Sequence, residues 1–214
     1  MGAKTWMLVY ADGNARDLLK DKPKLDRDAT TRLARELFPK VGLQAIDDGT
    51  LAYTCPPDDE ITIGCFPGLS VVAAAEFGVD YPSMLPPRFL RSAPGRTVYL
   101  HAMHSVVDWF AFAVWQDGRL KRSLSLSPDS GVLEDIGARL PFEGAYWSGK
   151  HPAVDHADED EDDPPYPFPF HPLELGEAAL GEFFGYHLEG EMTAIDPESI
   201  PLASFKRTSS TIKT

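Results

Sequence analysis

The segment that decides the fold runs from Trp109 to Leu126 and reads WFAFAVWQDGRLKRSLSL. Asp117-Gly118 separates two runs of alternating side chains, and this dipeptide is typical of a two-residue turn with positive φ at both positions. Such a turn fixes the register of the strands that it joins. Counting outward, the predicted pairs are Trp115 with Leu120, Ala113 with Arg122, Ala111 with Leu124, and Trp109 with Leu126.

One face of this hairpin carries tryptophan and alanine side chains, which we expect to face a core. The other face carries Phe110, Phe112 and Val114, and large apolar side chains in a row are not left in open water. A helix or another protein is therefore expected to cover it. The candidate helix spans residues 173–184, because Pro172 suits a first helical position and Gly185 suits the residue after the last turn.

Outside the hairpin, the pattern predicts further strands and one more helix. Thr5 to Tyr10 is apolar on both alternating faces, which is typical of a central strand covered on both sides. Residues 28–38 form an amphipathic helix that Asp26 or Asp28 can cap and Pro39 ends. The remaining predicted elements are hairpins over 43–55 and 61–75, a helical turn at 88–92, and a strand over 97–102.

These elements predict an α+β fold: a single domain with a mostly antiparallel sheet of about seven to nine strands and two main covering helices. The domain is expected to span residues 1–205, with an acidic and proline-rich insertion at about 152–171. Seven of the nine residues from Asp155 to Asp163 are acidic, which favours a solvated loop. Residues 206–214 are polar and are expected to form a frayed C-terminal tail.

Composition narrows the classes of function. The 33 acidic and 20 basic residues give a net charge of −13, and a surface of that sign repels nucleic-acid phosphates. No window approaches the roughly 18 apolar residues of a membrane-spanning helix, and the N-terminal apolar run is too short for a signal peptide. Cys55 and Cys65 have no zinc-site spacing and are expected to be free thiols. We therefore expect a cytoplasmic protein that binds neither nucleic acid nor membranes.

His101, His104 and Asp108 are candidate ligands for a divalent metal. Their spacing places them on one face of a helix, and two imidazoles with a carboxylate leave an open coordination position. The surrounding residues favour strands, however, where positions three apart point to opposite faces. In the alternative interpretation, His101 or His104 bonds a backbone carbonyl near a sheet edge and Asp108 accepts hydrogen bonds in a turn.

Tyr166, Phe168 and Phe170 alternate with prolines in the segment PYPFPF and are candidate partner-binding residues. Proline holds such a segment extended at little entropic cost, so the rings can offer buried area to a partner. The neighbouring acidic run would attract a partner with a basic surface. The alternative is that the same rings tuck under the helix that starts at Pro172 and tie it to the sheet.

Several blocks of sequence resemble an uncharacterised family of actinobacterial proteins. The resemblance spans nearly the whole chain and implies one intact domain. It points to no particular activity, ligand or partner. The blocks that carry it are Gly2-Ala3-Lys4-Thr5, His101-Ala102-Met103-His104-Ser105-Val106-Val107-Asp108-Trp109, Arg122-Ser123-Leu124-Ser125-Leu126-Ser127-Pro128 and Pro169-Phe170-His171-Pro172-Leu173-Glu174-Leu175-Gly176.

Two classes of function remain at the level of the sequence. The chain lacks a phosphate-binding glycine loop and a Gly-x-Ser-x-Gly motif, so we favour a cytosolic protein-binding or regulatory module without a cofactor. The alternative is a metal-dependent, hydrolase-like enzyme centred on His101, His104 and Asp108. The sequence predicts no particular oligomeric state.

Overall fold

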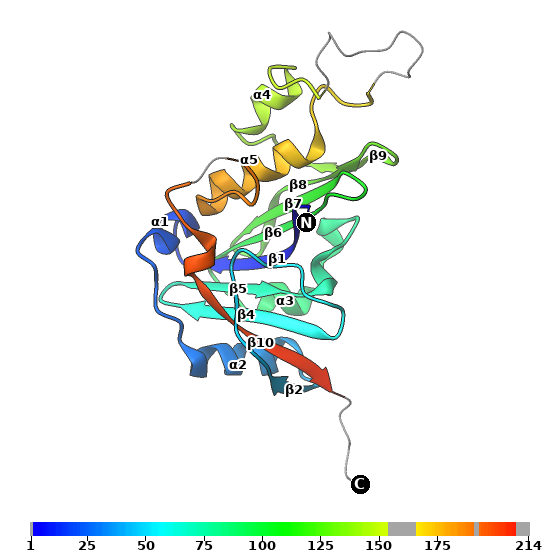
Figure 1. Ribbon diagram of the computed structural model, residues 1–214. Helices are drawn as coiled ribbons and strands as arrows, with labels where there is room; N and C mark the ends of the chain where they lie inside the picture. The colour runs from blue at the N-terminus through cyan, green and yellow to red at the C-terminus, as the bar shows by residue number, and fades with distance from the viewer. Residues whose placement is uncertain (1, 154–165, 191–192, 209–214) are drawn as a thin grey trace.

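Ten strands form one antiparallel sheet in the computed structural model, which describes residues 2–153, 166–190 and 193–208 (Figure 1). The order across the sheet is β2-β10-β4-β5-β1-β6-β7-β8-β9, and β3 pairs with β10 beside this path. The predicted α+β class is confirmed, and β3 takes the sheet one strand past the expected upper bound. The strands are β1 Lys4–Ala11, β2 Gly42–Ala45, β3 Gly49–Thr50, β4 Glu60–Phe66, β5 Leu69–Ala73, β6 Thr97–His104, β7 Trp109–Gln116, β8 Arg119–Ser127, β9 Gly131–Ile136 and β10 Pro201–Thr208.

Helices cover both faces of the sheet. The two predicted main helices are present as α2 and α5, and the predicted helical turn is α3. α5 packs on β6 and β7, whereas α2 packs on β4. The helices are α1 Ala15–Lys20, α2 Arg27–Leu37, α3 Pro87–Arg91, α4 Glu143–Trp147 and α5 Pro172–Phe184, and the 3₁₀ turns are η1 Ala75–Phe77, η2 Pro82–Met84 and η3 Pro197–Ser199.

Capping residues set the ends of the two main helices. The Asp26 side chain accepts a hydrogen bond from the Ala29 N–H at 2.9 Å, which satisfies one free donor in the first turn of α2. α5 begins with Pro172 and is followed by Gly185, whose φ of 77° is a left-handed conformation that glycine adopts without strain. Both caps agree with the sequence prediction.

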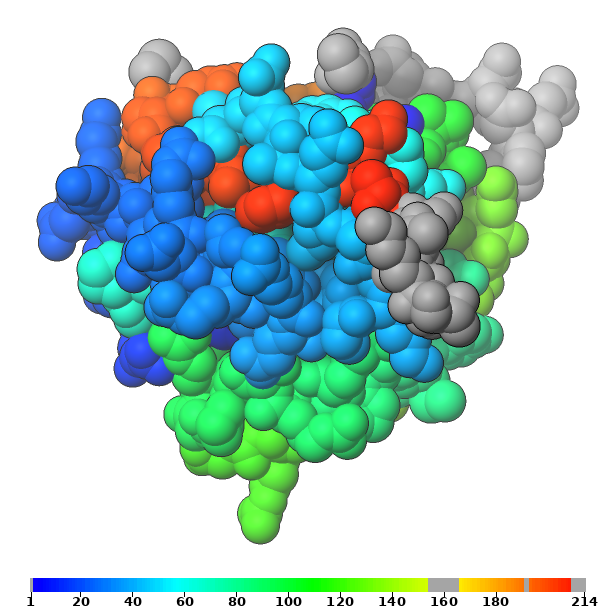
Figure 2. All heavy atoms as spheres, turned by 90° about the horizontal axis from the view of Figure 1, so that it is seen from below, coloured from blue at the N-terminus to red at the C-terminus, as the bar shows by residue number. Residues whose placement is uncertain are grey.

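The sheet separates two apolar cores, which we call the α5 face and the α2 face. Alternation along β1 sends Met7 and Val9 to the α5 face, and Leu8 and Tyr10 to the α2 face. β1 lies between β5 and β6, as predicted for a central strand. Figure 2 views the molecule from the α2 end, where the blue residues of the α2 segment lie beside the red residues of β10. The core of the α5 face includes Phe110, Phe112, Leu124 and Leu126, whereas that of the α2 face includes Leu100, Trp109, Ala111, Ala113 and Trp115.

The β7–β8 hairpin has the predicted turn but only part of the predicted register. Asp117 and Gly118 have φ values of 51° and 71°, as the turn requires, and Trp115 pairs with Leu120. A β-bulge next to Trp115 then brings one extra residue, Lys121, into β8. The other three predicted pairs are therefore wrong. The observed pairs are Ala113 with Ser123, Ala111 with Ser125, and Phe110 with Leu126.

The bulge decides which side chains of β8 join each core. Because it shifts β8 by one residue, Leu124 and Leu126 lie with Phe110 and Phe112 on the α5 face. α5 covers this face, as the sequence predicted for residues 173–184. The serines of β8 lie on the other face, where Ser125 accepts a hydrogen bond from an indole.

The predicted hairpin over 43–55 does not form. Both of its expected strands are short, and β2 and β3 each pair with β10 rather than with one another. Hydrophobic alternation reports a strand but not a partner that lies far away in the sequence. The hairpin predicted over 61–75 is present as β4 and β5.

Two predictions concern the ends of the described segments. Residues 206–208, expected to belong to a frayed tail, are instead part of β10, and the Arg207 guanidinium donates to the Glu76 carboxylate at 2.8 Å; residues 209–214 lie outside the described residues. Pairing on the sheet outweighs the polar composition of these residues. The acidic run from Asp155 to Asp163, in the predicted insertion at 152–171, lies outside the described residues.

Candidate functional site

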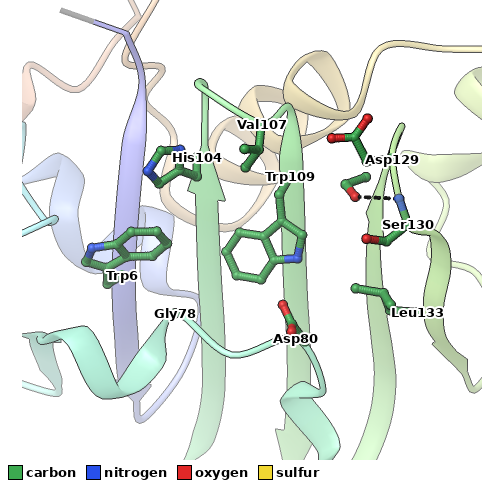
Figure 3. A pocket seen from close by; sticks show the side chains of 10 residues that line it. Trp6, Gly78, Asp80, His104, Val107, Trp109, Asp129, Ser130 and Leu133 are labelled. Carbon is green, nitrogen blue, oxygen red and sulfur yellow. Dashed lines mark hydrogen bonds between the residues drawn. The ribbon is translucent and has the colours of Figure 1, made fainter.

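A pocket with a volume of about 360 Å³ opens on the α2 face, where the β6–β7 and β8–β9 turns meet the loop between η1 and η2 (Figure 3). Its walls are formed by side chains from five strands, by the β6–β7 and β8–β9 turns, and by that loop. The lining residues are Trp6, Gly78, Asp80, His104, Val107, Trp109, Ser127, Asp129, Ser130 and Leu133.

Three aromatic rings on neighbouring strands form one wall of the pocket. His104 of β6 lies directly opposite Trp109 of β7 in the register, and Trp6 lies on β1 on the other side of β6. The ring centroids of Trp6 and His104 are 5.6 Å apart, and those of Trp6 and Trp109 are 5.9 Å apart. Figure 3 shows the three rings side by side across these strands.

Local contacts hold both indoles in place. The Trp109 Nε1–H donates to the Ser125 hydroxyl at 3.2 Å, which fixes the tilt of the ring. The Trp6 ring lies against Gly78, where a Cβ atom would come within 2.9 Å of the indole. A side chain at this position would therefore displace the Trp6 ring.

The His104 imidazole lines the pocket and is neutral at pH 7. Its Nδ1 accepts a hydrogen bond from the Val106 N–H at 3.2 Å, so its proton resides on Nε2. Partial burial lowers the pKa of His104, and the positive charge of Lys4, its neighbour on β1, lowers this pKa further. The ring therefore adds aromatic surface without adding charge.

Carboxylates provide the charge at this pocket. Asp80 comes from the loop after η1, and Asp129 comes from the turn between β8 and β9. Both residues are exposed, and no lysine or arginine is among the described residues that line the pocket. Figure 3 shows Asp80 below Trp109 and Asp129 on the far side of that ring. Two carboxylates thus lie beside the aromatic faces, while Lys4 lies next to His104 on β1.

The structure separates the predicted metal ligands. His101 points into the α5 face, where its Nε2–H donates to the Gly176 carbonyl at 3.0 Å and its Nδ1 lies 2.7 Å from the Thr5 hydroxyl. His104 points to the opposite face, as positions three apart on one strand do. Within residues 2–153, 166–190 and 193–208, no three His, Cys, Asp or Glu side chains are placed to hold a metal ion together.

Asp108 occupies the β6–β7 turn, where its φ is 47°. Its carboxylate lies 3.6 Å from Nε2 of His171, the residue before α5. Asp108 therefore lies next to His171, which is not among the predicted metal ligands. The turn interpretation of Asp108 agrees with its backbone conformation.

The predicted partner-binding rings lie largely inside the protein. Phe170 has no exposed surface, and Phe168 is only 9% exposed. Phe170 meets the Trp147 ring edge-on with a centroid distance of 4.9 Å, so it joins the segment to α4. Tyr166 is half-buried against the same core. Burial of Phe168 and Phe170 in the core of the α5 face leaves little of either ring exposed, whereas a docking role for the segment stays a prediction.

Sequence reasoning missed Trp6, Trp109 and Asp80 as site residues. The sequence predicts that Trp109 faces a core from the hairpin and that Trp6 lies in a strand covered on both sides. One signal was available: both tryptophans lie near strand ends, and Trp109 closely follows His104 in the chain. Their contact with one another depends on the pairing of β1 with β6, which local sequence does not encode.

The fold and the pocket define an α+β domain with an antiparallel sheet and an aromatic pocket at one of its ends. A family model described as a family of unknown function (DUF6928) matches residues 5–205, and the chain belongs to that family. The resemblance to an uncharacterised family is thus confirmed, while an actinobacterial origin stays a prediction. No curated protein and no solved structure matches the chain.

The helices in the described part of the chain are too short or too polar to cross a lipid bilayer. The longest of them, α5, has 13 residues. This agrees with the sequence, which contains no stretch of the required length.

Proposed function

We propose that this protein is a protein-binding module whose pocket captures a methylated ammonium group on a basic partner protein. The support is the combination of Trp6, His104 and Trp109 as walls with carboxylates at the same pocket. A cation over an aromatic face gains about 0.5 to 2 kcal/mol, and tryptophan is the best of the aromatic residues. Several such faces in one pocket make the attraction specific.

The chemistry of the pocket favours a methylated over a free ammonium. A free ammonium is strongly hydrated and needs an acceptor for each N–H, whereas methylation removes these donors and the tightly held water. Ring faces then replace the lost hydration, while Asp80 and Asp129 supply long-range attraction. The neutral state of His104 matters here, because a charged imidazole would repel the ligand.

A basic partner also suits the charge of the whole chain. The net charge of −13 speeds the approach of a positively charged protein and disfavours nucleic acid as a partner. Cys55 and Cys65 are free, which supports a reducing compartment such as the cytoplasm. We therefore keep a cytoplasmic, protein-binding role as part of the proposal.

A fluorescence titration tests the proposal, since both indoles of the pocket report on a bound cation. The probes are two copies of one short basic peptide, one with trimethyllysine and one with unmodified lysine. The methylated peptide is expected to quench tryptophan emission in a saturable manner and to bind about fivefold more tightly or better. Equal affinity for the two peptides, or no saturable change, would overturn the proposal.

Matched variants locate the binding. Trp6→Leu removes one wall and is expected to abolish the response, whereas Trp147→Leu changes a half-buried indole on α4 and is expected to leave the affinity unchanged. Asp80→Asn is expected to weaken binding, and Asp47→Asn, an exposed site outside the pocket, serves as its charge control. Thermal unfolding of each variant confirms that the protein is folded.

A metal-dependent, hydrolase-like activity at His101, His104 and Asp108 remains the second proposal, and its support is the sequence spacing alone. It requires the three side chains to rearrange, because the two histidines point to opposite faces. Elemental analysis of the untagged protein tests it. Near-stoichiometric zinc, manganese or iron that disappears in His104→Ala would support it, and metal content independent of this variant would remove it.

A further inference from the structure

A second and larger cavity, with a volume of about 710 Å³, lies beside the first turns of α5. Its other walls are formed by α4 and the residues that follow it, by Ala3 just before β1, and by the segment after α5. This volume is within the range of pockets that hold small organic molecules. The pocket with Trp6 and Trp109 shares none of its lining residues.

Acids and imidazoles dominate the polar lining of this cavity. α5 contributes Glu174 and Glu177, and the segment that follows it contributes His187 and Glu189. His151 and His171 complete the set, while the described lining includes no lysine or arginine. A cavity lined by carboxylates and imidazoles, without lysine or arginine, has many hydrogen-bond acceptors and little fixed positive charge.

Glu177 is the most constrained of these carboxyl groups. Its Oε2 accepts a hydrogen bond from the Leu188 N–H at 2.8 Å. Its Oε1 is buried and has no hydrogen-bond donor among the described residues. Burial raises the pKa of Glu177 to about 7 and the negative charge of Glu189 adds to this effect, while the backbone N–H groups of Leu188 and Glu189 oppose it. A buried acceptor without a donor is costly, so the site favours either a proton or a ligand with N–H groups.

Other contacts around the cavity fix its shape. His171 Nδ1 accepts a hydrogen bond from the Leu173 N–H at 3.3 Å, which caps α5 and leaves the Nε2 side near Asp108. The His151 ring stacks on Tyr146 at a centroid distance of 4.4 Å. The carboxylate of Glu189 accepts a hydrogen bond from the Ala3 N–H at 2.9 Å. The walls are therefore held by contacts that do not involve the free oxygen of Glu177.

We propose that this cavity is a separate binding site for a small molecule with a protonated primary amine, anchored by the carboxylate of Glu177. A primary ammonium carries three N–H donors, which match a carboxylate oxygen and imidazole acceptors. This is the opposite preference to that of the Trp6 pocket, which favours a cation without donors. The inference stands independently of the proposed function, because no residue is shared.

Proton balance makes the proposal measurable. The ammonium binds the ionised form of Glu177, so binding drives the remaining carboxyl proton into solution. At pH 7 a carboxyl group with a pKa of about 7 is partly protonated, so complete ionisation releases a fraction of a proton per ligand. The other titratable groups around this carboxyl are Tyr146, His151, His171, His187, Glu174, Glu189 and the buried Tyr186.

The experiment is a calorimetric titration with putrescine, a small primary diamine, at pH 7. Two buffers with different ionisation enthalpies and no primary amine are used, because the difference in heat gives the number of protons released. The whole 214-residue chain is expected to bind putrescine with release of a fraction of a proton per ligand. No binding, or binding without proton release, would overturn the proposal.

Variants test the role of Glu177 itself. Glu177→Gln keeps an acceptor for the Leu188 N–H but loses the charge, and we expect its affinity for putrescine to fall about tenfold or more with no proton release. Glu182→Gln removes one charge from the exposed side of the same helix and is expected to bind like the parent. Unchanged affinity in a folded Glu177→Gln protein would show that the amine binds elsewhere.

One further variant separates this site from the Trp6 pocket. Trp6→Leu is expected to bind putrescine as the parent does, with the same proton release. Loss of putrescine binding in this variant would place the amine in the Trp6 pocket and overturn the inference. A negative result with trimethyllysine peptide leaves the putrescine result intact, so the two proposals fail separately.

Discussion

His101 and His104 are three residues apart on one strand, yet they lie in two contrasting regions of the molecule. His101 is fully buried beneath α5, and both of its ring nitrogens have partners. His104 lies at the open end of the α2 face, where its ring lines a pocket. A histidine covered by a helix, such as His101, uses its ring nitrogens for hydrogen bonds inside the protein. A histidine at the uncovered end of the sheet, such as His104, can contact a ligand.

The covered region depends most on its aromatic rings, so removing one gives the largest expected effect. Phe170→Ala is expected to destabilise the protein by about 3 to 5 kcal/mol, because it leaves a cavity between α4 and α5. Urea unfolding measures the loss. Tyr166→Ala, at a half-buried ring of the same segment, is expected to lose clearly less. Equal losses in the two variants would contradict the assignment of Phe170 to the core.

The same contrast predicts an acid sensitivity located at His101. Burial lowers the pKa of His101 from 6.5 to about 4, so the unfolded chain binds a proton in this interval that the folded protein rejects. The stability from the neutral ring is complete above pH 6.5 and is lost as the pH falls toward 4, with a magnitude on the order of 3 kcal/mol.

Unfolding free energies at pH 7 and pH 4 measure this loss. His101→Phe removes the titrating group, so its difference between the two pH values is expected to be smaller than that of the parent. His151→Gln changes an exposed histidine and is expected to keep the parental difference. If His101→Phe retained the full acid loss, the buried imidazole would not be its cause.

The division between the two faces also depends on the register of the β7–β8 hairpin. Gly118 has a φ of 71° in open space, so the cost of a larger residue there comes from the backbone alone. Gly118→Val is expected to cost about 1 to 3 kcal/mol in thermal or urea unfolding. Gly13→Val also adds its side chain in open space but without a positive φ, and we expect a smaller loss. A Gly118→Val protein as stable as the parent would contradict the observed turn.

The open region is expected to show the smallest effect. The lowered pKa of His104 keeps the ring neutral at pH 7, and protonation at lower pH places a positive charge in the wall of a cation pocket. Affinity for the trimethyllysine peptide should therefore fall roughly two- to threefold as the pH drops through this pKa. His104→Gln is expected to remove this pH dependence. An affinity that rises on acidification would contradict the proposed charge of the ligand.

The sequence predicts those parts of the fold that depend on residues close together in the chain, such as strand alternation, helix ends and tight turns. Alternation identified β1 as a central strand, Asp26 and Gly185 marked helix ends, and Asp117-Gly118 gave its turn. The same pattern predicted that a helix covers Phe110 and Phe112. In each case the decisive residues lie within a few positions of the structure that they specify.

The remaining features depend on contacts between distant segments. The bulge at Lys121 allows Leu124 and Leu126 to pack on the α5 face while the two-residue turn is kept. Alternation alone predicts the register without a bulge. The strand partners of residues 43–55 come from the far end of the chain. The pocket likewise requires Trp6 to meet His104 across a strand pair, so its aromatic walls are not visible in either segment alone.

The position of β10 has a consequence for biosynthesis. β10 lies between β2 and β4, and it also holds β3, although it follows all three by well over a hundred residues. While the protein is being synthesised, the edge of β4 has no partner, and β2 has nothing on which to form. Such closure of a long chain segment is slow, and an unpaired strand edge is prone to aggregation. A nascent chain released before residue 201 would thus expose that edge to neighbouring polypeptides. Pairing of β10 with β4 is therefore the folding step that protects the sheet from aggregation.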